Sequence, residues 1–325
     1  MMQKVTITDV ARESGYGVGT VSRVISGDKS VKDSTRDKIN KVIADLHYVP
    51  NVNGARLRKK HSGVIAVMVP VINHPFFAEF VEQVEEIADK NGCSLLLVTS
   101  QMNKEKEAEI LKKIKQKEID GAIFVTHYQH DQKELEGCPL VSIDRHLSDE
   151  IPLVSSDNYQ ATRKALETLY AHRARRIGFL GTEPSVESEV SLRKQAYDDF
   201  VKEKGLPSLD KWEIVDHGKE GELVASFLKE CPNLDAVFAS NAIVATLFRK
   251  AALAQGIRFP EDCELICYDG VSPVWGDGSI SCLRQDIQAM AETSFLLLQD
   301  LIEGKKVKAR NIIPTQTILG QTTRK

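Results

Sequence analysis

Polar side chains follow four apolar runs in this 325-residue sequence, at points where β-strands are expected to end: Asn73, Asp144, Asn241 and Asp269. Open α/β sheets bind ligands beyond the carboxyl ends of their strands, so these four residues are candidate ligand contacts. Carboxylates and amides form paired hydrogen bonds with adjacent hydroxyls, and Arg193 in "SLRKQAY" can bridge two such hydroxyls. This chemistry suits a small sugar.

Three aromatic residues could supply an apolar surface for the C–H face of a sugar ring: Phe76, Phe77 and Trp275. We expect Phe77 to lie in the hydrophobic core. Phe76 and Trp275 either contact the ligand or cap a hydrophobic core, because aromatic rings beside strand ends serve equally well in both roles.

Three glycines, Gly15, Gly17 and Gly19, lie within five residues in "ESGYGVGTVSRVI". A dinucleotide-binding loop needs the spacing G-x-G-x-x-G between a buried strand and a helix. Here the spacing is G-x-G-x-G, and the preceding "TDVARES" has helical periodicity. What remains is a turn between two steeply angled helices, in which Gly15 can adopt the positive φ that such a turn requires. We therefore predict a helix-turn-helix.

The sequence lacks the residue patterns of an enzyme or a metalloprotein. Its six cysteines include no C-x-x-C pair and are predicted to be reduced, mostly structural thiols. His127 and His130 have no nearby cysteine or carboxylate pattern that would complete a metal site, so we expect them in a solvated loop. No nucleophile–base pair is recognisable. We predict a protein that is not an enzyme and needs no metal or cofactor.

Charge is distributed unevenly along the chain, although the net charge is only −3. Residues 1–60 hold 12 Lys and Arg against 6 Asp and Glu, whereas residues 61–325 hold 31 against 40. A basic head on an acidic body is typical of a small nucleic-acid-binding unit joined to a larger domain, although a solvated basic tail would give the same counts. Neither a transmembrane run nor a secretory signal is recognisable, so we expect no membrane partner and a cytoplasmic location.

Beyond about residue 60, short apolar runs alternate with amphipathic stretches. The runs "VIAVMVP", "SLLLVTS" and "GAIFVT" lack polar alternation, which favours parallel strands covered on both faces. The pattern resumes at "RIGFLG" and continues through "DAVFAS", a helix over 241–255 and "ELICYDG". Two such series predict two α/β lobes.

The first 60 residues have helical rather than strand periodicity. Thr6 and Asp9 could cap the first of three short helices. The three apolar stripes are Ile7, Val10 and Ala11; then Val21, Val24 and Ile25; then Ile39, Val42, Ile43 and Leu46, before Pro50 ends the third helix.

Residues 5–51 resemble the amino-terminal domain of the LacI/GalR family of bacterial transcription regulators, because T-x-x-D-V-A, T-V-S-R-V, T-R and Y-x-P-N occur in order and spacing. The resemblance implies an α/β protein with a helix-turn-helix domain over 1–50 and a hinge helix over 51–61. Residues 62–325 would form a bilobed, periplasmic-binding-protein-like core of two parallel-sheet subdomains. It further implies a homodimeric repressor of carbohydrate uptake and catabolism genes. This repressor would bind a pseudo-palindromic double-stranded operator under the control of a small sugar or sugar phosphate.

On this resemblance, the second helix begins near Val18 and enters the major groove. Arg23 can donate two parallel hydrogen bonds to a guanine, Val18 offers only a methyl surface, and Gly19 faces the bases without a side chain. A core position is the alternative for Val18. The hydroxyls of Thr20 and Ser22 would contact phosphates. The DNA-contacting set also includes Thr8, Gly17 and Thr35.

The segment "NVNGARLRKK" resembles the hinge helix of the family, which folds when two copies meet in the minor groove. Leu57 would be the apolar wedge that unstacks two base pairs and kinks the duplex. Asn51 and Arg56 would contact the DNA backbone. A basic linker is the alternative.

The same resemblance places four residues on the effector positions of the family: Arg193, Asn241, Asp269 and Gln285. Two helix-cap positions depart from the family pattern, because Gly17 and Lys32 stand where the family usually has serine. Gly17 can still cap its helix with little loss. Asp33 or Ser34 could replace the second of these caps. No carboxyl-terminal heptad repeat is present, so we predict a dimer rather than a tetramer.

The sequence does not identify the sugar, the operator or whether a phosphorylated protein acts as corepressor, and we favour a sugar that releases DNA. The alternatives to a repressor are a cytoplasmic sugar-binding protein and a sugar-processing enzyme, neither of which would need a basic three-helix head.

Overall fold

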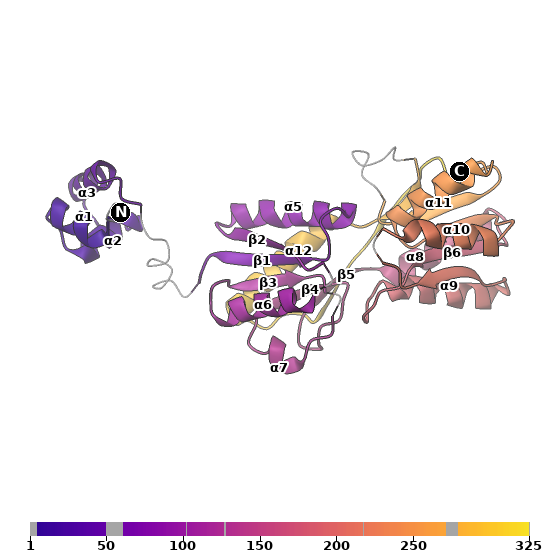
Figure 1. The fold of residues 1–325 in the computed structure, drawn as a ribbon, viewed down its shortest axis with the longest axis horizontal. Coiled ribbons are helices and arrows are strands. Elements are labelled where there is room, and N and C mark those ends of the chain that lie inside the picture. The colour runs from indigo at the N-terminus through magenta and orange to yellow at the C-terminus, as the bar shows by residue number, and fades with distance from the viewer. Residues whose placement is uncertain are drawn as a thin grey trace. The chain divides into compact units, whose positions relative to one another are not determined.

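The computed structural model describes residues 5–49, 61–101, 103–126, 128–216, 218–270 and 279–324. The chain forms two compact units, Met1–Ser62 and Gly63–Lys325, each with hydrophobic cores of its own (Figure 1). Within the described ranges, no helix is long and apolar enough to cross a membrane.

Three short helices form the N-terminal unit: α1 (Ile7–Ser14), α2 (Val18–Ile25) and α3 (Asp33–Asp45). α1 begins with the predicted capping box, in which Thr6 and Asp9 each accept from the backbone N–H of the other. It ends at Gly15, whose φ of 74° turns the chain toward α2. The predicted helix-turn-helix is confirmed. The buried core of the unit consists of Val10, Ala11, Val21, Val24, Ile39 and Tyr48.

Neither α2 nor α3 begins with a side-chain cap. Lys32 is the N-cap residue of α3, so the expectation that Asp33 or Ser34 would cap this helix is wrong. Asp33 already lies in the first turn. The loop before α3 is held instead by Arg36, whose Nη2 donates to the backbone carbonyl of Asp28 at 2.7 Å.

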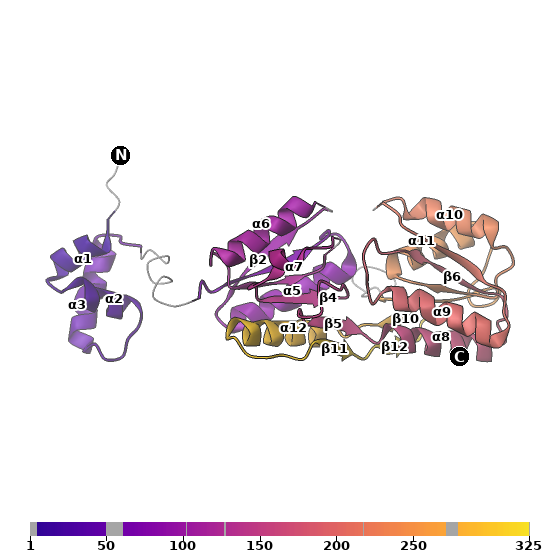
Figure 2. The same ribbon diagram turned by 90° about the horizontal axis from the view of Figure 1, so that it is seen from below.

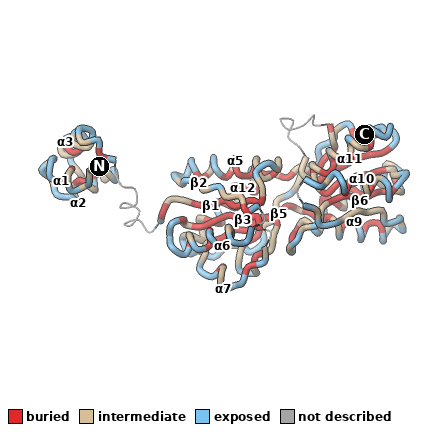
Figure 3. Tube along the Cα trace, in the orientation of Figure 1, coloured by how far each residue is buried: buried red, intermediate tan, exposed pale blue. Residues whose placement is uncertain are grey.

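The first lobe of the larger unit is a six-stranded parallel sheet in the order β11-β5-β4-β3-β1-β2. Its strands are β1 (Val64–Val69), β2 (Ser94–Thr99), β3 (Gly121–Phe124), β4 (Leu140–Ile143), β5 (Leu153–Ser156) and β11 (Arg310–Ile313). Helices α5 (Pro75–Lys90) and α12 (Ile287–Ile302) cover one face, and α6 (Lys104–Lys115) and α7 (Gln132–Leu135) cover the other. The central strands β1, β3 and β4 are buried except for Val64 at the start of β1, as their unbroken apolar runs predict (Figure 3).

The second lobe repeats this three-layer arrangement with a sheet in the order β12-β10-β9-β8-β6-β7. Its strands are β6 (Ile177–Thr182), β7 (Leu209–Glu213), β8 (Ala236–Ala239), β9 (Glu264–Tyr268), β10 (Ser281–Arg284) and β12 (Gln316–Ile318). α8 (Asn158–Ala171) and α9 (Ser191–Lys204) pack on one face, and α10 (Glu220–Glu230) and α11 (Ala242–Ala254) pack on the other. The predicted fold of two α/β lobes is confirmed.

The chain passes between the lobes three times, after β5, after β10 and after β11 (Figure 2). The last passage returns the chain against β10, so β12 pairs antiparallel, unlike its neighbours in the sheet. The apolar runs did not indicate this strand because it is short and exposed.

His130 is buried, so the expectation of a solvated loop is wrong for this residue. Its Nε2 lies 2.6 Å from Oε2 of Glu107, and both side chains are fully buried. The hydroxyl of Thr126 donates to the same carboxylate oxygen. Glu107 comes from α6, and the local sequence around His130 does not reveal this partner. His127 lies outside the described residues.

Candidate functional site

The outer face of α2 presents the residues that were expected to read DNA. Val18 is 39% exposed, and Gly19 and Arg23 are also exposed, whereas Val21 and Val24 point into the core. Because the helix packs with its Val21–Val24 side, its first turn and Arg23 face solvent. The core alternative for Val18 is thereby excluded.

The other predicted DNA contacts that the structure describes are all at least partly exposed. Thr8 and Gly17 are exposed, and Thr20, Ser22 and Thr35 are partly buried. Gly17 is the N-cap of α2 and supplies no side-chain hydrogen bond to the helix. The predicted hinge contacts lie outside the described residues: Asn51, Arg56 and Leu57.

A pocket of about 240 Å³ lies between the two lobes of the larger unit, at the carboxyl ends of their strands. The first lobe lines it with Val71, His74, Phe76, Phe77, Val125, Asp144 and Arg145, among others. The second lobe contributes Thr182, Glu183, Arg193, Ile214, Asp216, Glu220, Ser240, Asn241 and Asp269, and Gln285 comes from the β10–α12 connection. The rule that ligands bind beyond strand ends therefore gathers Asp144, Asn241 and Asp269 in one cavity.

Arg193 on α9 is held from several sides and is only 2% exposed. Its Nε donates to Oδ1 of Asn158 at 2.6 Å, and its Nη1 donates to the carbonyl of Ser240 at 2.7 Å. Its Cζ lies 3.5 Å from the ring centroid of Tyr268, and Nη1 lies 3.8 Å from Oδ2 of Asp269. These contacts fix the plane of the guanidinium, so it can offer two parallel donors only in one direction.

Asp144 and Asp269 follow β4 and β9 with left-handed backbones, at φ of 56° and 69°. Aspartate tolerates this conformation better than most residues because its short side chain bonds locally. Oδ1 of Asp144 accepts from the Ser155 hydroxyl at 2.6 Å, and Oδ1 of Asp269 accepts from Nε2 of Gln285. Burial raises the pKa of Asp144, against the lowering effect of the nearby Arg193.

Two amides line the same pocket. Gln285 is 4% exposed, and its Oε1 has no hydrogen-bond partner within the described ranges. Since Asp269 can only accept, the Gln285 amide must turn its nitrogen toward Asp269, which leaves Oε1 for a ligand hydroxyl. Asn241 caps α11 by accepting from the Val244 N–H at 2.9 Å, so its amide nitrogen is the atom left for a ligand.

The aromatic residues divide differently from the prediction. Phe76 is 6% exposed and belongs to the hydrophobic core, yet it also lines the pocket. Phe77 was expected in the core, but it is only partly buried and lines the pocket with its ring centroid 4.8 Å from that of His74. Asn73 is exposed and does not line the pocket, whereas its neighbour His74 does. Trp275 lies outside the described residues.

Sequence reasoning missed several lining residues that the same end-of-strand rule could have found. Arg145 directly follows Asp144 after β4, and Asp216 follows the end of β7 by three residues. Burial lowers the pKa of Arg145 to about 10. Within the described ranges, no group of three or more His, Cys, Asp or Glu side chains forms a metal site. The pocket is thus built for hydrogen bonds to a small polar molecule.

Two family models match the chain. The model described as "Bacterial regulatory proteins, lacI family" matches residues 6–51, which contain the helix-turn-helix. The model described as "Periplasmic binding proteins and sugar binding domain of LacI family" matches residues 62–293, which contain all the pocket residues named above.

Curated relatives are similar over nearly the whole chain. The ribose operon repressor of Bacillus subtilis is 31% identical over 333 residues, covering 98% of this chain and 99% of its own. The ribose operon repressor of Halalkalibacterium halodurans is 30% identical over 323 residues, covering 98% and 97%. The sucrose operon repressor of Streptococcus mutans is 28% identical over 318 residues, covering 97% and 98%.

Solved structures share the fold. A periplasmic binding protein/LacI transcriptional regulator from Alkaliphilus metalliredigens, complexed with D-xylulofuranose, aligns with a TM-score of 0.70 and 27% identity, covering 81% of this chain and 100% of its own. The lac repressor dimer bound to operator and the anti-inducer ONPF aligns with a TM-score of 0.84 and 22% identity, covering 99% of both chains.

Proposed function

This chain belongs to the LacI family of bacterial regulatory proteins and is a DNA-binding repressor with a sugar-binding core, and we propose how it is controlled. The protein is a cytoplasmic homodimer that binds a pseudo-palindromic operator. A small neutral sugar binds between the lobes of the core and lowers the affinity of the homodimer for this operator. Residues 1–50 bind DNA, residues 51–61 form the hinge, and residues 62–325 bind the sugar and dimerise. The observation that carries the proposal is the pocket itself, in which both lobes present polar groups suited to hydroxyls beside the Phe77 ring.

The charges in the pocket favour a neutral sugar over a sugar phosphate. Arg193 already donates to Asn158 and to the Ser240 carbonyl, so its charge is partly engaged. A phosphate would add negative charge to a lining that holds more carboxylates than guanidinium groups. The lining carboxylates are Asp144, Glu183, Asp216, Glu220 and Asp269. The names of the ribose and sucrose operon repressors and the D-xylulofuranose complex support a sugar of this kind.

On the DNA side, the exposed face of α2 supports direct reading of bases in the major groove. Arg23 donates to a guanine, and Val18 contacts an apolar base edge such as the thymine methyl group. Thr20 and Ser22 hold the phosphates that set the register. Leu57 of each protomer acts as the wedge in the minor groove.

Sugar and operator are coupled through a shift between two states of the dimer. The sugar closes the lobes, changes the separation of the two hinge segments and so disfavours the DNA-bound state. The coupling is reciprocal and in the usual range of about 1–3 kcal/mol. The scheme needs no protein corepressor, because the sugar acts on the same chain that binds DNA.

The experiment that tests the proposal selects DNA with the purified full chain from fragments of the source genome, at near-physiological salt. Enrichment of one pseudo-palindromic sequence supports a dimeric repressor, and sugar transport or hydrolase genes beside it identify the sugars to test. Retention that is unselective and falls steeply with salt would overturn the proposal, because it would show phosphate binding alone.

A further inference from the structure

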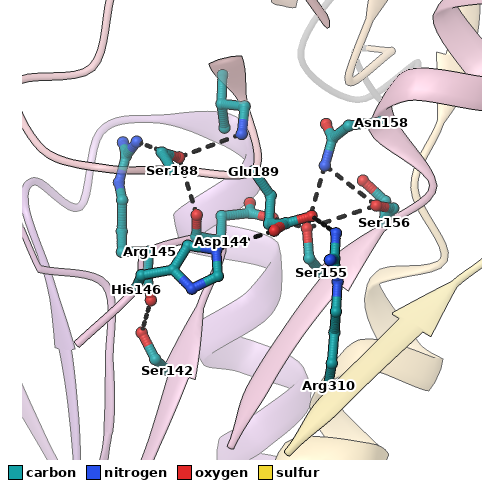
Figure 4. A network of polar contacts seen from close by, with 11 residues as sticks. Ser142, Asp144, Arg145, His146, Ser155, Ser156, Asn158, Ser188, Glu189 and Arg310 are labelled. Atoms are coloured by element: carbon teal, nitrogen blue, oxygen red, sulfur yellow. Dashed lines mark hydrogen bonds and ion pairs between the residues drawn. The ribbon is translucent and has the colours of Figure 1, made fainter. Parts of the chain in front are cut away.

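A set of contacts outside the pocket also joins the two lobes (Figure 4). Residues 144–146, which follow β4 of the first lobe, lie against residues 187–189, which precede α9 of the second. The two segments form an isolated antiparallel bridge. The N–H of Glu189 donates to the carbonyl of Asp144 at 2.8 Å. The lobes are therefore linked by hydrogen bonds at a place where the chain does not cross.

Glu189 from the second lobe is the charged centre of these contacts. Its side chain is 5% exposed. Its Oε1 lies 2.9 Å from Nε2 of His146, and its Oε2 accepts from Nη2 of Arg310 at 2.5 Å. His146 and Arg310 both belong to the first lobe. Separating the lobes would remove both partners and leave a carboxylate that must be hydrated again.

The same contacts reach the pocket through Asp144. Its carbonyl accepts from the Ser188 hydroxyl at 2.8 Å as well as from the Glu189 N–H, while its side chain lines the pocket. The Ser188 hydroxyl also accepts from Nη1 of Arg145 at 2.6 Å, and Arg145 lines the pocket too. Two pocket residues are thus held by the second lobe through their own backbone or guanidinium.

We propose that His146, Glu189 and Arg310 form an interlobe latch, which holds the lobes in the arrangement in which both of them line the pocket. Glu189 is a positioning residue, because none of the three latch residues lines the pocket. A ligand that touches both lobes prefers the latched arrangement, so the latch strengthens sugar binding without touching the sugar. The effect on sugar rests on the function proposed above, whereas the latch itself does not.

The latch can be tested without any sugar by hydrogen–deuterium exchange on the full chain. The N–H groups of Glu189 and His146 donate across the lobes, to the carbonyls of Asp144 and Glu187. In Glu189→Gln we expect these two amides to exchange faster than in the wild type. The substitution removes the carboxylate that pairs with His146 and Arg310 of the opposite lobe, so the lobes separate more often. The matched control is Glu203→Gln, which removes an arginine–glutamate pair that lies within the second lobe.

A second measurement uses calorimetry with the sugar identified from the operator genes. Glu189→Gln and Arg310→Gln should each weaken sugar binding by between about fivefold and 150-fold, the usual range for coupled sites. The double variant should bind no more weakly than Glu189→Gln alone, because Glu189→Gln already breaks the pair with Arg310. Arg310→Lys should recover part of the affinity, which loss of general stability would not explain.

Unchanged amide exchange in Glu189→Gln together with unchanged sugar affinity would overturn the latch, and so would equal effects in Glu203→Gln. If the wild type binds none of the sugars that the operator genes indicate, the proposed function is wrong. Amide exchange alone then decides whether the latch exists. If Glu189→Gln does not fold, Arg310→Gln takes its place in both measurements, because the Arg310 side chain is 56% exposed.

Discussion

The guanidinium of Arg193 stacks on the phenol ring of Tyr268, with Cζ 3.5 Å from the ring centroid. The Tyr268 hydroxyl in turn lies 2.9 Å from Oγ of Ser156, and burial raises the pKa of Tyr268, so the ring stays neutral. A neutral ring face attracts a cation and adds no charge of its own. This stack therefore orients Arg193 in the pocket without weakening its donors.

Replacing Arg193 should separate the two activities of the chain. Arg193→Ala is expected to cost about 2–5 kcal/mol of sugar affinity, because it removes a buried donor and leaves Asn158 and Asp269 without it. Arg193→Lys should restore little, since an ammonium lacks the planar fork. Operator affinity without sugar should stay at the wild-type level. Calorimetry with sugar and fluorescence anisotropy with operator measure the two effects.

Arg258→Ala is the matched control for this prediction, because Arg258 forms an exposed pair with Asp262 in the same lobe. It should leave both affinities unchanged. If Arg193→Ala kept the sugar response, Arg193 would not be a residue that binds the sugar.

Substitutions of Arg23 and Lys59 should weaken DNA binding in different ways. Arg23→Ala is expected to cost about 1–3 kcal/mol on the operator and to relax the preference at one base pair, because we propose that Arg23 donates to a base edge. Lys59, which lies outside the described residues, should act on phosphates. Lys59→Ala should weaken all sequences alike and lower the salt slope by about one. Titrations of operator and random DNA at several salt concentrations distinguish them, and equal losses on both DNAs for both variants would refute this assignment.

The buried pair of His130 and Glu107 should matter for stability rather than for ligand binding. His130→Ala leaves the Glu107 carboxylate buried without its imidazole partner, which is expected to cost about 3–5 kcal/mol of unfolding free energy. Glu134→Gln serves as control, because Glu134 is 38% exposed and lies 3.4 Å from the other ring nitrogen. Urea unfolding curves give both values. A loss below about 1 kcal/mol for His130→Ala would show that the pair contributes little.

The buried thiols should react only at high pH. Burial raises the pKa of Cys263 to about 12 and that of Cys282 to about 11. Since the thiolate is the reactive form, iodoacetamide at pH 8 should spare both in the folded protein and modify both in urea. Mass spectrometry of the alkylated peptides checks this. Rapid labelling of either thiol in the folded chain at pH 8 would show that the site opens.

The raised pKa values of Cys263 and Cys282 also predict that the folded chain loses stability as the pH rises. The folded chain binds these two protons more tightly than the unfolded chain, whose cysteines titrate at about pH 8.5. The contribution to stability is therefore fully present below about pH 8.5 and is lost as the pH rises toward the folded values of about 11 and 12. Unfolding free energies measured between pH 7 and 10 should fall accordingly, and a rise over this range would contradict the assignment.

Much of the fold was predictable because its signals are local. Unbroken apolar runs indicated buried parallel strands, and Gly15 and Gly92 stand at the left-handed positions where α1 and α5 give way to the next element. The site was predictable where it follows strand ends, as for Asp144 and Asp269. The prediction was wrong for Asn73, because the loop before α5 leaves Asn73 exposed and places its neighbour His74 in the lining of the pocket.

The remaining features depend on partners that are distant in sequence. Glu189 meets His146 and Arg310 across 43 and 121 residues, and nothing in its neighbourhood indicates either contact. The buried position of His130 depends likewise on Glu107, which lies 23 residues away on α6. The local sequence around a charged residue predicts that its side chain is exposed to solvent. Only the packing of helices and sheets shows that such a side chain is buried and paired.

We propose that a sugar held between the lobes controls the affinity for operator DNA, and one titration can decide this. Operator selected from the genome is labelled, and its fluorescence anisotropy with the full chain is followed as neutral sugars are added. We predict that one sugar weakens the operator affinity of the wild type by about 5–150-fold and leaves Arg193→Ala unaffected. Operator affinity that no sugar changes, or that changes equally in Arg193→Ala, would show that the pocket does not control DNA binding.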